Sequence, residues 1–139
     1  MITEDYVSFE TAKLLKEKGF DEATNRYYNA QYDQIRTVSD TFMWHWNDEE
    51  FMKRVLMEGA IAIPTLQMAM KWLRENFNIN PVPYALSLGW YFEVFDLTQR
   101  DITGCALLYQ VGIPSKEQVF KSSEEACEAA IKYCLENLI

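Results

Sequence analysis

The fold is decided by the run WYFEVFDL at residues 90–97. Aromatic and β-branched side chains, which are typical of β-strands, make up most of this run. Two further strand-like runs lie on either side of it, at residues 84–88 and 105–111. The connections between the runs are too short for a parallel crossover, which needs a dozen or more residues. The sequence therefore predicts a three-stranded antiparallel meander, with Val119 and Phe120 adding to its edge.

The segments on either side of this meander have helical periodicity. Apolar residues recur three and four positions apart from Pro64 to Phe77, and proline is well tolerated in the first turn of a helix. Ser122 begins a capping box, which predicts a last helix that reaches about Asn137. The fold class expected from this order is α+β, with a three- to five-stranded antiparallel sheet, helices packed on one face and a C-terminal helix.

The N-terminal part is harder to interpret. Ser8 as N-cap and Gly19 as terminator predict a short amphipathic helix up to Lys18. A loose hairpin and a third strand are predicted further on, at residues 26–29, 34–38 and 42–46. Asn47 is expected to cap a brief helix that ends near Glu58.

No linker, repeat or low-complexity stretch interrupts the 139 residues. We therefore predict a single domain, 1–139. Its N-terminal part (1–63) combines helix with irregular β structure, and its C-terminal part (64–139) has the order helix–strand–strand–strand–helix.

The charge balance bears on the classes of partner. Thirteen basic residues stand against 21 acidic ones, for a net charge of -8, and the only adjacent basic pair is Lys53-Arg54. Proteins that bind nucleic acid or anionic membranes cluster their Lys and Arg residues. The sequence therefore predicts neither a nucleic-acid partner nor a membrane partner.

The expected location is the cytoplasm. No apolar run approaches the ~18 residues that span a bilayer, and the acidic N-terminus lacks the basic and apolar regions of a signal peptide. The three cysteines, Cys105, Cys127 and Cys134, are an odd number without a CxxC motif. This usage argues against a disulfide framework and favours a reducing compartment.

No constellation of residues points to catalysis, and the prediction leans away from an enzyme. His45 is the only histidine, which excludes metal sites and proton relays that need two. Nucleotide, hydrolase and metalloprotease motifs are missing from the sequence. The carboxylate groups at Asp48-Glu49-Glu50 and Glu124-Glu125 fit the first turns of predicted helices. We therefore assign no catalytic, cofactor-binding or metal-binding residue and expect no cofactor.

Aromatic residues are unusually abundant, with 4 Trp, 8 Tyr and 8 Phe. The strand predicted at 90–97 has large apolar groups on both faces, so one face needs cover from the N-terminal part or from a partner. The candidate aromatic binding surface comprises Tyr27, Tyr28, Trp44, His45, Trp46, Tyr91 and Phe95.

The sequence resembles two groups of proteins. The order of elements from Pro64 to Leu138 is similar to a double-stranded-RNA-binding domain, but Glu124 and Glu125 stand where that family has lysines. This likeness implies shape without RNA binding. The segments at 6–22, 64–75 and 124–139 resemble uncharacterised small proteins that recur in genomes and in mobile or prophage-like regions of gut anaerobic bacteria. That group implies no activity.

The function favoured by these observations is a small, acidic, non-enzymatic bacterial module that acts through a protein partner or through self-association as a homo-oligomer. One alternative is a small-molecule-binding protein or enzyme that uses an aromatic pocket around His45. The other is an acidic mimic of nucleic acid that inhibits a DNA-handling protein.

Overall fold

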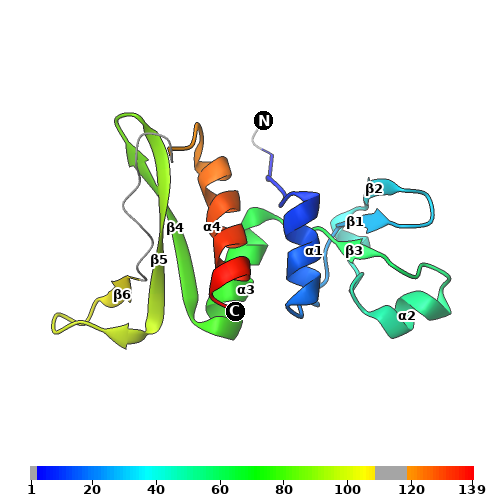
Figure 1. Ribbon diagram of the computed structural model, residues 1–139. Coiled ribbons are helices and arrows are strands. Elements are labelled where there is room, and N and C mark those ends of the chain that lie inside the picture. Colours follow the sequence, from blue (N-terminus) through cyan, green and yellow to red (C-terminus); the bar gives the residue numbers. More distant parts are fainter. Residues whose placement is uncertain (1–2, 109–118) are drawn as a thin grey trace. The chain divides into compact units, whose positions relative to one another are not determined.

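The computed structural model describes residues 3–108 and 119–139 (Figure 1). The chain forms two compact units, Met1–Thr65 (unit 1) and Leu66–Ile139 (unit 2). Within the described residues, each unit has helices and a three-stranded antiparallel sheet, with strand orders β2-β1-β3 and β4-β5-β6. The predicted α+β class with a C-terminal helix is confirmed, and its strands divide between two sheets. The single-domain organisation stays a prediction.

Helix α1 (Phe9–Glu17) has the boundaries that the sequence predicts. The Ser8 hydroxyl oxygen accepts a hydrogen bond from the Thr11 amide at 3.2 Å, as an N-cap does. Gly19 takes a φ of +94°, and the amides of Gly19 and Phe20 donate back to carbonyls in the last turn. This is a Schellman ending, and glycine suits it because its backbone adopts positive φ without a Cβ penalty.

The sheet of unit 1 contains the predicted hairpin but a different third strand. Strands β1 (Arg26–Asn29) and β2 (Gln34–Thr37) pair antiparallel, and β3 (Ile61–Ala62) lies on the other side of β1. The strand predicted at 42–46 was wrong. Its first residue ends the 3-10 helix η1 (Asp40–Phe42), and Trp44 makes a single bridge to the segment before β1.

Helix α2 (Glu49–Arg54) begins one residue later and ends earlier than predicted. Asp48, not Asn47, is the N-cap, and its carboxylate accepts from the Phe51 amide at 3.1 Å. The Asn47 side chain instead donates to a carbonyl 27 positions away and accepts from an amide 15 positions away. These two tertiary bonds explain why the capping prediction at Asn47 was wrong. The helix ends at Arg54 and does not reach Glu58.

Unit 2 has the order helix–strand–strand–strand–helix, with α3 (Leu66–Phe77), β4 (Ile79–Leu86), β5 (Gly89–Arg100), β6 (Ala106–Leu108) and α4 (Ser123–Asn137). The predicted antiparallel meander is confirmed, although the residues expected to extend the third strand to 111 lie outside the described residues. Both helices contact the sheet from the same side (Figure 1). The rings of Phe92 on β5 and Tyr133 on α4 are 5.9 Å apart.

Two predicted contacts around this sheet are confirmed. Phe120 pairs with Trp90 of β5 through two main-chain hydrogen bonds, which adds Phe120 to the sheet as predicted. Ser122 caps α4 by accepting from the Glu125 amide at 3.1 Å. The buried face of α4 consists of Ala126, Cys127, Ala130, Ile131, Cys134 and Leu135.

Strand β4 is longer than the sequence predicts and contains Pro81 and Pro83. It borders the described sheet on one side, where a strand tolerates proline because its outward amides have no partner to lose. The Leu97 amide donates to the Asn78 carbonyl, so even-numbered residues of β4 face β5 in the ladder. The nitrogens of both prolines therefore point away from the sheet.

Among the described residues, no helix has both the length and the apolar character needed to cross a membrane.

Candidate binding groove

The base of the candidate site is a pair of stacked rings in unit 1. The Trp46 indole lies 3.8 Å from the Tyr27 ring with an interplanar angle of 13°, and both side chains are buried. The Trp46 Nε1 donates to the Thr24 carbonyl oxygen at 2.7 Å. Stacking and this hydrogen bond together hold Trp46 in one orientation.

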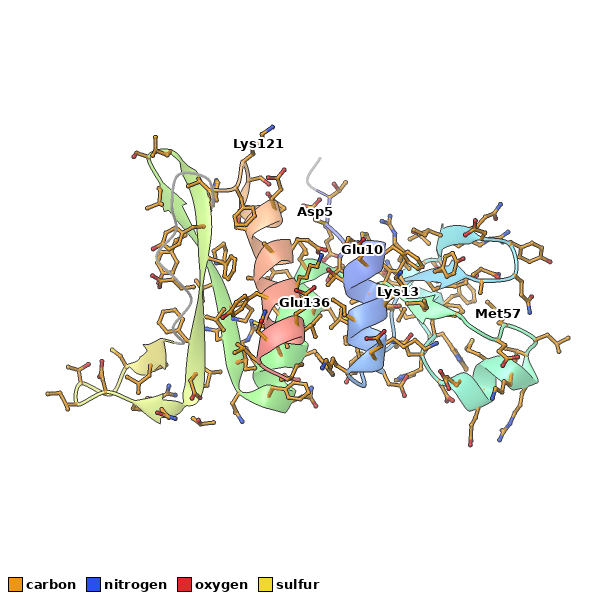
Figure 2. The ribbon with its side chains drawn as sticks, in the orientation of Figure 1. Asp5, Glu10, Lys13, Met57, Lys121 and Glu136 are labelled. Atoms are coloured by element: carbon orange, nitrogen blue, oxygen red, sulfur yellow. The ribbon has the colours of Figure 1, made fainter. Side chains whose placement is uncertain are left out.

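An apolar groove lies beside this pair, and we call it the α2 groove. Its volume is about 450 Å³, and it is lined by Val38, Phe42, Trp44, Trp46, Phe51, Met52, Val55 and Met57. These residues come from the end of the hairpin, from η1 and the segment after it, and from α2 and the segment that follows it. Figure 2 labels Met57 in this last segment.

Three of the lining side chains are open to solvent. Phe42 is 70% exposed, and Trp44 and Val55 are each 44% exposed. The centroids of the Trp44 and Phe51 rings are 5.0 Å apart, and the two rings are tilted by 38° relative to each other. Large apolar side chains that gather at one exposed place mark an interaction site more often than single exposed ones do.

His45 lies between the two tryptophans in sequence but does not line the groove. Its Nδ1 is 2.7 Å from the Asp21 carbonyl oxygen and 3.6 Å from the Asp21 carboxylate. Adjacent residues of an extended segment point to opposite sides, which separates His45 from its two neighbours. The groove therefore has no histidine base.

The other residues of the predicted aromatic surface lie elsewhere. Tyr28 packs against Phe9 with ring centroids 4.6 Å apart, and its hydroxyl donates to the Asp33 carboxylate, which raises the pKa of Tyr28. Tyr91 and Phe95 belong to β5 in unit 2, on the sheet face opposite α4. Of the seven predicted residues, Trp44 and Trp46 thus line the groove and Tyr27 supports it. That the N-terminal part or a partner covers the second face of β5 stays a prediction.

Sequence reasoning missed several lining residues. Phe51, Met52 and Val55 belong to the brief helix predicted after Asn47, and Phe42 to the strand predicted at 42–46, and neither prediction marks them as a binding surface. The usable signal was an apolar stripe on a short helix directly after two closely spaced tryptophans. A helix of six residues has fewer than two turns, so an apolar stripe along it is not buried as completely as the stripe of a longer helix.

A second hollow in unit 1 is polar. It is lined by Thr3, Glu4, Asp5, Tyr6, Val7, Asn25, Arg26 and Asp40. The Arg26 guanidinium lies 3.7 Å from the Tyr6 ring centroid and donates to the Thr37 hydroxyl. The Asn25 amide joins Tyr6 to Asp40. The side chains of Tyr6, Asn25 and Asp40 are therefore engaged with one another.

No group of three or more His, Cys, Asp or Glu residues in the described parts of the chain could hold a metal ion. The thiols differ in environment. Burial raises the pKa of Cys127 and raises that of Cys134 to about 12, whereas Cys105 is exposed.

We expect DTNB to modify only Cys105 in the folded protein at about pH 8. The thiolate is the reactive form, and burial keeps Cys127 and Cys134 protonated. Absorbance should report one thiol per chain under native conditions and three after denaturation. The Cys105→Ser variant should show none when folded, and rapid native modification of this variant would contradict the buried placement.

Comparisons of the chain with protein-family models, with curated proteins and with solved structures found no match.

Proposed function

We propose that the protein is a non-enzymatic binding module that holds an apolar segment of a partner protein in the α2 groove. The observation that carries this proposal is the exposure of Phe42, Trp44 and Val55 around a groove with wholly apolar lining residues. Removing apolar surface from water contributes about 25 cal/mol per Å². Binding of a partner that covers these side chains is therefore made more favourable in proportion to the apolar area that it buries.

A protein segment suits the groove better than a small polar ligand. Ligand sites combine apolar walls with a few convergent polar groups that fix the orientation of the ligand. The side-chain donors among the lining residues are the two indole Nε1 groups of Trp44 and Trp46, and that of Trp46 already bonds the Thr24 carbonyl. The groove therefore favours a row of apolar side chains over a molecule that needs hydrogen bonds.

The test is to select binders from a displayed library of random peptides on the purified protein. We expect enrichment of peptides with several large apolar side chains. The Phe42→Asp variant should weaken their binding about tenfold or more, because an aromatic side chain at the centre of an interface contributes that much. Phe42 is 70% exposed, so the change removes little of the folded core.

Tyr32→Asp is the matched control, because Tyr32 is 65% exposed in the same unit and lies outside the groove. This variant should bind the selected peptides like the unmodified protein. The proposal fails if no peptide is enriched or if binding is insensitive to Phe42→Asp. If the protein's own sequence is recovered in the selected peptides, the partner is a second copy of the chain.

A further inference from the structure

The outer edge of β2 has unpaired main-chain groups. Strand β2 lies at the border of the described sheet of unit 1, with β1 on its other side. The Val38 amide donates to the Asn25 carbonyl, which continues the ladder between the two strands and fixes its alternation. Because hydrogen-bonded and non-hydrogen-bonded pairs alternate in an antiparallel ladder, the N–H and C=O groups of Ile35 and Thr37 point away from β1. No described residue donates to or accepts from these four groups.

This edge is open to another chain. All four residues of β2 are exposed, and the Ile35 side chain is 54% exposed. Strand β4, at a border of the other described sheet, differs because Pro81 and Pro83 lack amide hydrogens. A sheet border with free N–H and C=O groups can add a further strand. The edge of β2 is therefore a place at which an extended polypeptide can pair.

Arg36 is the only charged side chain on its face of strands β1 and β2. It lies directly opposite Tyr27, and the other residues on this face are Asn29 and Gln34. The guanidinium donates to the Gln34 side chain at 3.1 Å and lies 5.7 Å from the Tyr32 ring centroid. It forms no ion pair with a carboxylate in the described parts of the chain. An added strand would place one residue directly across from Arg36, at a non-hydrogen-bonded pair, where side chains are closest.

The same charge disfavours a second copy of this edge as the partner. In the symmetric antiparallel arrangement, Ile35 of one chain pairs with Thr37 of the other, and Arg36 faces its own copy. Like charges directly opposite each other destabilise a strand pair, whereas opposite charges stabilise it. Arg36 therefore selects against self-pairing and in favour of a strand with a carboxylate at the facing position.

We propose that β2 pairs antiparallel with an extended segment of a partner protein, in which Asp or Glu faces Arg36 between two β-branched residues. The main-chain groups of Ile35 and Thr37 bond the segment, as happens when a peptide adds a strand to a sheet. The β-branched residues lie on the other face, where they cover the Ile35 side chain beside Tyr28. This surface is a second one and does not depend on the α2 groove.

The probes are three fluorescein-labelled peptides of alternating threonine and valine, in which glutamate, glutamine or lysine replaces the central threonine. Fluorescence anisotropy measures their binding at about 50 mM salt, where exposed charges are little screened. We expect the glutamate peptide to bind about threefold tighter than the glutamine peptide and about tenfold tighter than the lysine peptide. Charged pairs on facing strands have effects of about this size.

The Arg36→Glu variant should reverse this order, so that the lysine peptide binds tightest. Its matched control is Arg100→Glu, which changes the net charge equally at an exposed strand residue of unit 2. The control should retain the preference for glutamate. Equal binding of the three peptides, or the same effect of the two variants, overturns the acidic partner.

The Ile35→Pro variant tests the main-chain pairing. It removes an outward amide and leaves the hydrogen bonds between β1 and β2 in place, because an edge strand tolerates proline where its amide points outward. It should weaken the glutamate peptide about tenfold or more, since the proline ring also obstructs the added strand. Ile35→Val is the control, because it retains the amide and should bind as the unmodified protein does.

Hydrogen exchange in the unmodified protein gives a second measurement, which does not depend on how a variant folds. The Ile35 and Thr37 amides should exchange more slowly when the glutamate peptide is bound. Unchanged exchange at both amides, or binding that survives Ile35→Pro, rejects pairing at β2. Absence of binding by all three peptides also rejects it and leaves the α2 groove unaffected. Binding that is lost in Phe42→Asp but retained in Ile35→Pro places the peptide in the α2 groove and overturns the inference.

Discussion

Replacement of Trp46 by alanine is expected to lower the free energy of unfolding by about 3–5 kcal/mol, the usual cost of truncating a buried tryptophan. The Trp46 side chain is 9% exposed. Its removal leaves a cavity against Tyr27 and deletes the hydrogen bond to Thr24. Urea unfolding followed by far-UV circular dichroism measures the loss.

The neighbouring tryptophan supplies the control. Trp44→Ala should cost about 1 kcal/mol or less, because the Trp44 side chain is 44% exposed. The same variant should weaken binding of peptides to the α2 groove. Trp46→Phe retains a stacking ring and should lose only about 1 kcal/mol from the missing hydrogen bond, together with a small change in packing. Similar losses for Trp44→Ala and Trp46→Ala would contradict the placement of the two indoles.

Replacement of Gly89 by valine should destabilise unit 2 by about 3 kcal/mol. Gly89 has a φ of +143°, and strain of this kind costs about 1–3 kcal/mol for other residues. A Cβ there would lie 2.5 Å from the Val119 side chain and 2.7 Å from the Phe120 carbonyl oxygen. Segment 119–120 must therefore move, which breaks its two main-chain bonds to Trp90 at about 0.5–1.5 kcal/mol each.

Hydrogen exchange at the Trp90 and Phe120 amides reports the detachment directly, because both amides should lose protection in Gly89→Val. Gly104→Ala is the comparison. Gly104 also has positive φ, +88°, but a Cβ there meets no atom within 4 Å. It should cost about 1 kcal/mol from backbone strain alone. If both variants lost the same stability, crowding at Gly89 would play no part.

The elements that sequence analysis predicted well are those with local causes. Helix α1 has its cap and its terminating glycine within eleven positions of each other, and α4 begins at a serine followed by two glutamates. The meander of unit 2 follows from short connections between aromatic runs. Each of these signals operates between near neighbours, so no knowledge of the rest of the chain was needed.

The predictions that failed depend on distant residues. Asn47 has the right chemistry for an N-cap, but Phe20 and Ala62 engage its side chain. Residues 42–46 alternate weakly as a strand does, but Ile61–Ala62 takes the place beside β1. Strand β4 contains two prolines, and only its position at the border of the sheet makes them acceptable. Tertiary context decided each case.

The candidate site could be predicted only in part. The aromatic excess drew attention to Trp44 and Trp46, which line the α2 groove, but it also included residues of β5, which belongs to unit 2. The contributions of Phe42, Val55 and Met57 depend on where a 3-10 turn and a short helix place their side chains. A hydrophobic residue on such elements has the same sequence signature whether it is covered or left open to water.

The prolines of β4 also affect how the protein behaves at high concentration. The border of a sheet can template a foreign strand through its free amide hydrogens, which is a common first step toward fibrils. Pro81 and Pro83 remove two successive outward donors from the middle of β4. Continuous main-chain hydrogen bonding between this border and another polypeptide is therefore interrupted. Strand β2 has no such protection and all four of its residues are exposed. Of the two outer strands β2 and β4, β2 is therefore the one more open to backbone pairing with another chain.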